Sequence, residues 1–277
     1  MKNWLGWIGV GLCCVACGGE IEAIDPAPAL ETLSVVERSR IELGRDLFFD
    51  PGLSGDGTIA CASCHAPAQA GAGAEATSTG IGGARTRRNS PTVFNVGFKE
   101  YLFWDGRAQS LEEQALGPLF DAGEMGASEK GVLNYLERYR ERFARSFPEE
   151  AEPLSLDTLA RSLSDYQRQL VTPSRVDAYL KGDVSALSAQ EVAGLERFQD
   201  DCTSCHDGPG VGGRDLRELG EQESWPAERS ADLGRFEHTG DDDDRLVFAV
   251  PILRNVSRTA PYFHDGSVTT LEEAIRL

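Results

Sequence analysis

Two short stretches decide the fold of this chain: Cys61-Ala62-Ser63-Cys64-His65 and Cys202-Thr203-Ser204-Cys205-His206. Both read C-x-x-C-H, so each places two thiols and one imidazole in a single short segment. The chain has 277 residues and seven cysteines, and the other three cysteines all lie within the first 17 residues. The two motifs therefore use every cysteine of the part that is expected to fold.

The C-x-x-C-H motif is typical of covalent attachment of c-type haem. The two thiols add to the haem vinyl groups, and the adjacent imidazole becomes the proximal ligand of the iron. A redox dithiol, a structural zinc site or a disulfide would compete for a single C-x-x-C. Two copies, each followed at once by histidine, favour two haem groups. The haem groups are expected to be attached through Cys61 and Cys64 and through Cys202 and Cys205. Their irons are expected to be ligated by His65 and His206.

The composition narrows the class of partner. Lys and Arg number 27 against 45 Asp and Glu, which gives a net charge of −18. A nucleic-acid-binding protein normally has the opposite balance, so no nucleic-acid partner is expected. A basic protein partner is easier to accommodate. With 40% hydrophobic residues, the chain is expected to fold rather than to remain disordered.

The N-terminus is a predicted export segment. Residues 1–17 combine the positive Lys2 with an apolar run that is too short to span a bilayer. A small residue before Cys17 resembles a bacterial lipoprotein signal, which predicts acylation of Cys17. An ordinary secretory signal peptide is the alternative. Residues 18–30 are predicted to form a tether, and the protein is expected in the periplasm, anchored to the membrane by lipid.

Helices are expected before each motif. Ser34 with Glu37, and Ser188 with Glu191, form capping boxes that open helices leading into the two C-x-x-C-H stretches. A helix followed by this motif is the opening of a cytochrome c domain. A third helix is predicted over residues 156–170, from apolar side chains at 3.6-residue spacing, with Thr172-Pro173 ending it.

An internal repeat divides the chain. Residues 91–117 and 251–277 share nine identities in 27 positions at a constant offset of 160. The sequence therefore predicts an all-α protein with two related haem domains at residues 31–172 and 173–277. The first unit continues well beyond the repeat, whereas the second stops within it. We expect the second domain to be truncated at its C-terminus, a naturally short domain being the alternative.

Taken together, the motifs resemble those of the bacterial dihaem cytochrome c peroxidases, a family that includes MauG-type enzymes. The resembling stretches are Leu43–Ser54, Arg88–Asn95, Phe103–Ala108, Thr172-Pro173 and Pro261–Ser267. The resemblance implies that peroxide reacts at the N-terminal haem. It also implies that the C-terminal haem accepts electrons from a small donor protein, a c-type cytochrome or a cupredoxin. Members of this family usually form homodimers, so the resemblance also implies a homodimer.

The same resemblance assigns roles to individual residues. Trp104 would lie between the haems, although core packing alone could explain it. Gln114 and Glu124 match the distal-pocket pair, in which Glu124 would move a proton between the peroxide oxygens. A solvated loop carboxylate is the alternative for Glu124. His264 is expected to bind the second haem at a propionate.

A calcium site between the domains is a further implication. Asn89, Thr259 and Pro261 match a set that uses the Asn side chain and two carbonyls, and oxygen ligands suit Ca²⁺. The acidic run Asp241–Asp244 is a rival site, but such runs are usually solvated loops. His238 is expected at the surface.

Two departures from the family pattern affect the haems. Ile81 stands where many members carry a second histidine on the peroxidatic haem, so we expect that iron to be permanently open. The distal ligand of the second haem would follow Leu277, and Met125 is the only methionine besides the initiator. The identity of the distal ligand of the second haem therefore cannot be used to distinguish a peroxidase from a MauG-type enzyme.

The leading functional hypothesis is an exported dihaem peroxidase that reduces hydrogen peroxide to water. A MauG-like oxidase acting on a protein substrate is the alternative within enzymes, and an open N-terminal haem favours it slightly. A non-enzymatic dihaem electron carrier is the alternative from another class. Such a carrier would have no use for Gln114 and Glu124 beside an open haem.

Overall fold

The computed structural model describes residue 24 and residues 33–220 and 231–277. The predicted export segment, its Cys17 and the tether, apart from Ile24, lie outside these residues. Within the described part of the chain, none of the helices is both long and apolar enough to cross a membrane.

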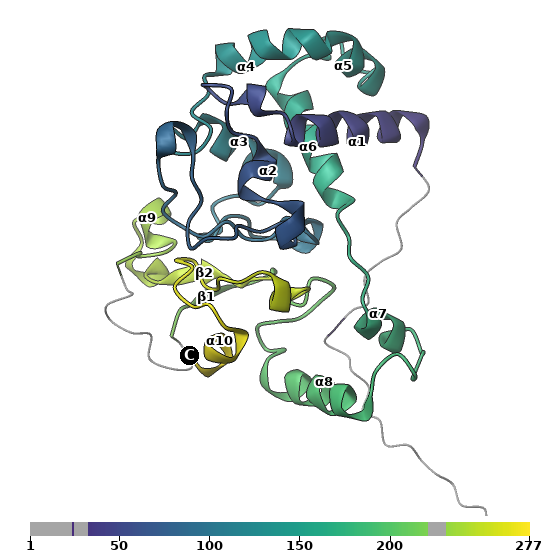
Figure 1. Cartoon of the computed structure of the whole chain (residues 1–277), viewed down its shortest axis with the longest axis vertical. Helices are drawn as coiled ribbons and strands as arrows, with labels where there is room; N and C mark the ends of the chain where they lie inside the picture. Colours follow the sequence, from purple (N-terminus) through teal and green to yellow (C-terminus); the bar gives the residue numbers. More distant parts are fainter. Residues whose placement is uncertain (1–23, 25–32, 221–230) are drawn as a thin grey trace, which may run out of the picture.

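The described residues form ten α-helices, several short 3-10 helices and one small sheet. The helices are α1 (Val35–Phe48), α2 (Cys61–Cys64), α3 (Leu111–Phe120), α4 (Glu129–Leu136), α5 (Arg140–Ser146), α6 (Leu156–Arg168), α7 (Arg175–Leu180), α8 (Ala189–Asp201), α9 (Phe236–Thr239) and α10 (Leu271–Arg276). The strands are β1 (Leu216–Glu218) and β2 (Val247–Ala249). Helices α1 to α6 gather in one part of the molecule, and the remaining elements lie below them in the view of Figure 1.

The first half is built around the packing of α1 against α6. Helix α1 begins at the predicted capping box, in which Ser34 and Glu37 bind each other's backbone N–H groups. Helix α6 crosses it so closely that a Cβ added at Gly44 would lie 1.8 Å from the carbonyl oxygen of Ser162. Helices α3 and α5 complete this layer. The core that results includes Leu43, Leu47, Phe143, Phe147, Leu159 and Leu163.

The second half has less internal packing. Helix α8 begins at the predicted capping box of Ser188 and Glu191, but none of its residues is buried. Strands β1 and β2 pair antiparallel, with Leu216 opposite Ala249. The structure is mostly helical, as expected, and this small sheet is its one addition to the expected all-α fold within the described residues. Each strand has only three residues, which is too short for a period of two to be recognised in the sequence.

Both copies of the predicted repeat adopt the same backbone conformation. Asn95 and Asn255 have φ angles of 61° and 60°, and each precedes a 3-10 turn. Phe103 and Phe263 have φ angles of 60° and 66°, an uncommon conformation for bulky side chains. The two segments therefore share these uncommon backbone positions as well as their sequence.

Thr172 joins the two copies just after α6. Its hydroxyl accepts hydrogen bonds from the side-chain amides of Asn95 and of Asn255, each at 2.7 Å. Its own N–H donates to the side-chain oxygen of Asn95 at 2.9 Å. The residue predicted to end the first domain therefore binds the same position in both repeats.

Candidate active site

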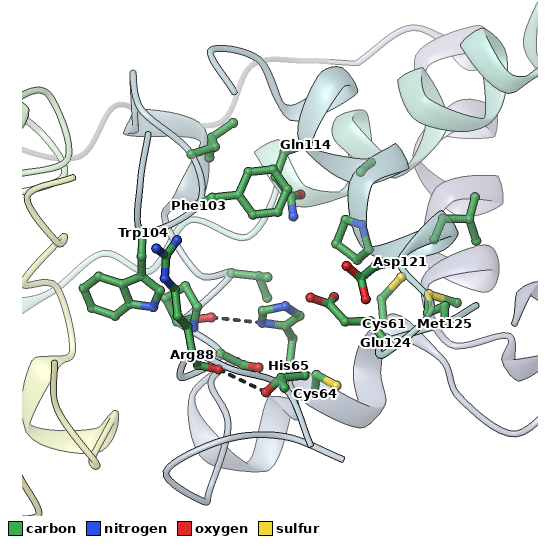
Figure 2. A pocket seen from close by; sticks show the side chains of 18 of the residues that line it. Cys61, Cys64, His65, Arg88, Phe103, Trp104, Gln114, Asp121, Glu124 and Met125 are labelled. Carbon is green, nitrogen blue, oxygen red and sulfur yellow. Dashed lines mark hydrogen bonds between the residues drawn. The ribbon is translucent and has the colours of Figure 1, made fainter. Parts of the chain in front are cut away.

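A cavity of about 510 Å³ lies in the first half of the molecule. This volume is in the range of ordinary ligand and cofactor pockets. Figure 2 shows labelled side chains converging on it from α2, from α3 and from the loops that follow these helices. Its wall brings together seven of the site residues predicted from the sequence: Cys61, Cys64, His65, Asn89, Trp104, Gln114 and Glu124.

The first C-x-x-C-H motif forms a single helical turn. Helix α2 spans Cys61–Cys64, and the N–H of His65 closes the turn on the carbonyl of Cys61. Nδ1–H of His65 donates to the carbonyl of Pro91 at 2.9 Å, which leaves Nε2 as the nitrogen that can ligate a metal. Pro91 opens the first repeat, so the repeat orients the imidazole of the motif.

The donor set fits a covalently held haem. None of Cys61, Cys64, Cys202 and Cys205 is paired in a disulfide. Burial raises the pKa of Cys61 to about 12, so in the protein alone this group is a neutral thiol in an apolar part of the cavity wall. Across residues 33–220 and 231–277, no three His, Cys, Asp or Glu side chains are grouped to hold a metal ion on their own. One imidazole beside two thiols and a cavity matches haem better than zinc.

Glu124 sits on a tight turn after α3. The carbonyl of Asp121 accepts from the N–H groups of Glu124 and Gly126, and the N–H of Met125 bonds to the carbonyl of Pro118. The side chain of Asp121 also accepts from the N–H of Gly123 at 2.7 Å. These bonds fix the backbone on both sides of Glu124, so its carboxyl is held against the cavity rather than on a mobile loop.

The environment of Glu124 makes its carboxyl a weaker acid than a freely solvated one. Burial raises the pKa of its carboxyl, the negative charge of Asp121 raises it further, and Arg107 partly offsets both. A carboxyl whose pKa is raised towards neutrality is suited to moving protons. The alternative of a freely solvated carboxylate does not match this half-buried position in the cavity wall.

Ile81 packs on the Glu124 turn. Its N–H donates to the carbonyl of Glu124 at 2.9 Å, and a Cβ at Gly126 would lie 2.2 Å from its Cδ1 atom. A Cβ at Gly80 would lie 1.9 Å from the carbonyl oxygen of Gly123. The backbone of the segment that contains Gly80 and Ile81 therefore contacts the backbone of the Glu124 turn directly. Of the described residues that line the cavity, His65 is the only histidine.

Trp104 and His264 meet where the two repeats face each other. They occupy the same position in the two copies, and their rings lie 6.4 Å apart in an edge-to-face arrangement. The N–H of Asn89 donates to the carbonyl of His264 at 2.7 Å, and the equivalent N–H of Ala249 donates to that of Trp104 at 2.8 Å. The contact is therefore reciprocal, as in a twofold-symmetric interface. Trp104 also donates from its indole to the carbonyl of Asn89.

The second motif has a similar backbone with a different ring environment. The N–H of His206 bonds to the carbonyl of Cys202, as in the first motif. Its Nδ1 atom is buried and makes no hydrogen bond of good geometry, although Pro251, the counterpart of Pro91, is close by. Burial lowers the pKa of His206, so the neutral imidazole that iron ligation requires is favoured.

The residues of the expected calcium site are already hydrogen-bonded in part. The Asn89 side-chain amide donates to the carbonyls of Glu75 and Ala76, and the hydroxyl of Thr259 donates to the carbonyl of Val256. The rival run at Asp241–Asp244 is an exposed turn, capped by the Asp241 side chain. His238 is exposed, as expected.

An ion-pair network across the two halves was not anticipated from the sequence. Arg88 binds Asp232 through two hydrogen bonds of 2.6 and 2.7 Å, and Asp105 through one of 2.6 Å. Burial works against ionisation of Asp232, but the bonds from Arg88 outweigh it and lower the pKa of the carboxyl. Arg87 beside it pairs with Glu237. The only indication in the sequence was that Arg88 begins the stretch Arg88–Asn95, which resembles a motif of the family.

Comparison with known sequences gives a consistent result. The family model for di-haem cytochrome c peroxidases matches residues 38–185. The chain is 41% identical to cytochrome c551 peroxidase from Pseudomonas aeruginosa, over 87% of this chain and 72% of that protein. It is 37% identical to the enzyme of the same name from Nitrosomonas europaea, over 94% and 78%. Methylamine utilization protein MauG from Methylophilus methylotrophus is 33% identical, over 91% and 74%.

Solved structures share the fold. A MauG-like protein associated with microbial copper homeostasis superposes with a TM-score of 0.77 at 35% identity, over 91% of this chain and 79% of that one. The diheme peroxidase BthA from Burkholderia thailandensis gives a TM-score of 0.70 at 24% identity, over 92% and 79%. The family match covers more than half of the chain, and the named relatives are enzymes. The protein is thus a member of the di-haem cytochrome c peroxidase family.

Proposed function

We propose that this enzyme reduces hydrogen peroxide to water with electrons from a small donor protein. Peroxide, two protons and two electrons yield two molecules of water. Membership of the family implies two haem c groups, and the bound haem iron supplies the electron exchange with peroxide. The main observation in support of the proposal is that His65, Gln114 and Glu124 line the same cavity.

In this proposal the two motifs have separate tasks. Cys61 and Cys64 attach the haem at which peroxide reacts, and His65 ligates its iron. Cys202 and Cys205 attach the electron-accepting haem, and His206 ligates its iron. The hydrogen bond to Pro91 supports this role for His65, because such a bond fixes the orientation and the tautomer of a ligating imidazole.

Glu124 acts as the acid–base group. Its carboxylate accepts the proton from one peroxide oxygen and returns it to the other, so that water can leave. The raised pKa supports this assignment, because a weaker acid holds the proton more readily between the two events. Gln114, on the adjacent face of α3, offers an amide to hydrogen-bond peroxide and hold it in place.

Trp104 couples the two centres. It lines the cavity and also contacts His264 in the second repeat, so it touches both halves of the molecule. We place His264 beside a propionate of the second haem. Asn89, Thr259 and Pro261 form the proposed calcium site near the same interface.

The donor and the location belong to the same proposal. Export to the periplasm and acylation of Cys17 would place the enzyme at a membrane surface, where small donor cytochromes or cupredoxins diffuse. The net charge of −18 suits a basic donor, because opposite charges accelerate association. We also propose a homodimer.

Substitution of Glu124 tests the proposal. Glu124→Gln keeps the size and polarity of the side chain but cannot transfer the proton, so peroxide turnover with a reduced donor should fall about 10²- to 10⁴-fold. Glu129→Gln, an exposed carboxylate at the start of α4, is the matched control and should keep full activity. Equal turnover in the two variants would refute the role of Glu124. No turnover in the wild type would favour an electron carrier.

A MauG-like oxidase acting on a protein substrate is the second candidate. The presence of Ile81 in place of a second histidine favours it, because no other imidazole lies in the described cavity wall. The two functions differ in where the electrons originate. With peroxide and no donor, an oxidase would leave an oxidised protein substrate, detectable by mass spectrometry, whereas a peroxidase would stop after its own reducing equivalents are consumed.

A further inference from the structure

Lys99 occupies a position that the proposed mechanism does not use. It follows a 3-10 turn (Val96–Phe98), and its N–H closes that turn on the carbonyl of Val96. The next residue, Glu100, donates its N–H to the carbonyl of Gly213 at 2.9 Å. The side chain of Lys99 lines the same cavity as Cys61, Cys64 and His65. Its ammonium group therefore lies at the boundary between the two halves, in the wall of the first haem site.

The other cations of the cavity wall already have anionic partners. Arg85 pairs with Glu75, Arg87 with Glu237, Arg88 with Asp232 and Asp105, and Arg107 with Asp105. Lys99 forms neither a hydrogen bond through its ammonium group nor an ion pair with any residue that the structure describes. It is the one cation of this wall that the described protein leaves without a counter-charge.

An unpaired ammonium group in such a place is costly. Burial lowers the pKa of Lys99 to about 8, and no neighbouring charge contributes to the shift. The carboxyl groups of Asp121 and Glu124 line the same cavity, but neither forms an ion pair with Lys99 or contributes to this shift. Hydrogen peroxide carries no charge and cannot compensate it either. An anion that enters the cavity with the cofactor would do so.

We propose that Lys99 is the counter-charge and anchor for a propionate carboxylate of the N-terminal haem. A c-type haem held by the first motif carries two such carboxylates, and a carboxylate that is buried in the cavity needs a cationic or hydrogen-bonding partner. An ammonium–carboxylate contact of this kind is a charge-assisted hydrogen bond. Lys99 is then a positioning residue: it fixes the orientation of the haem plane between His65 and Glu124, and it neutralises negative charge near the iron. This inference rests on the proposed haem site.

Substitution of Lys99 tests the pairing in the holoenzyme. Lys99→Met should lower the reduction potential of the N-terminal haem, because an uncompensated carboxylate disfavours the reduced iron. Lys99→Arg keeps the charge and should restore most of the wild-type potential. Lys130→Met, on the exposed face of α4, removes a charge elsewhere and should leave both potentials unchanged. Redox titration followed by EPR resolves the two haems.

The outcomes separate this inference from the function on which it rests. Unchanged potentials in Lys99→Met, or a shift confined to the C-terminal haem, would overturn the assignment. An experimental structure of the wild-type holoenzyme tests it without any substitution: Lys99 Nζ should lie about 2.7–3.2 Å from a propionate oxygen. A larger separation would also overturn it. If Cys61→Ser with Cys64→Ser leaves the covalent haem content unchanged, the haem site itself is wrong, whatever Lys99 does.

Discussion

The helices that lead into the two C-x-x-C-H motifs begin alike but are covered very differently. Both α1 and α8 open with a Ser–Glu capping box. Helix α1 buries Leu43, Leu47 and Phe48 beneath α5 and α6, whereas α8 buries none of its residues. A capping signal therefore fixes where a helix starts, but the elements that pack on it decide how much it stabilises the fold.

The same contrast holds at the interface between the repeats. Trp104 and His264 are equivalent residues, and the backbone bonds around them are reciprocal. The side chains nearby have diverged: Arg88 of the first half binds two carboxylates, while its counterpart Phe248 stacks on His264 at 4.2 Å. A symmetric backbone thus carries two different sets of side chains at this interface.

Loss of Arg88 should have the largest effect on stability. Arg88→Met removes the main partner of Asp232, which keeps only a longer contact to Arg87, and one of the two partners of Asp105, so it should cost about 3–5 kcal/mol in the free energy of unfolding. Arg140→Met removes the exposed pair with Glu137 and should cost less than about 1 kcal/mol. Urea unfolding of the two holoproteins measures the difference. Similar costs would mean that the network does not hold the halves together.

The contrast between α1 and α8 can be measured with one type of substitution. Leu43→Ala, at a side chain that is 0% exposed, should destabilise the protein by about 2–5 kcal/mol. Leu195→Ala, at a half-buried position on α8, should cost clearly less. The comparison uses the midpoints of thermal unfolding of both holoproteins. Equal losses would show that α8 is as well covered as α1.

The pH dependence of turnover should follow the charges around Glu124. As a base, Glu124 must be ionised when peroxide arrives, so activity should be lost as the pH falls through its raised pKa. Asp121→Asn removes a charge that raises this pKa, so the acidic limb of kcat/KM should move to lower pH. This shift is expected to be small, and the pH profiles of both proteins measure it. A limb that stays in place or moves upward would exclude Glu124 as its source.

Local patterns made much of this molecule predictable. The capping boxes at Ser34 and Ser188, the 156–170 helix, observed as Leu156–Arg168, and the repeat were all readable because each depends on residues close in sequence. The pairing of Arg88 with Asp232 spans 144 positions, and no periodicity specifies it. The burial of Lys99 without an ion pair among the described residues is likewise a product of tertiary packing. Its neighbours in the sequence do not reveal it.

The state of the N-terminal iron tests the central claim most directly. We propose that the first half of the molecule forms an open peroxide site, with Ile81 packed on the Glu124 turn and His65 as the one imidazole in the described wall. The EPR spectrum of the oxidised holoprotein, recorded before any reduction, should contain a high-spin ferric haem signal. A spectrum in which both haems are wholly low-spin would contradict the account.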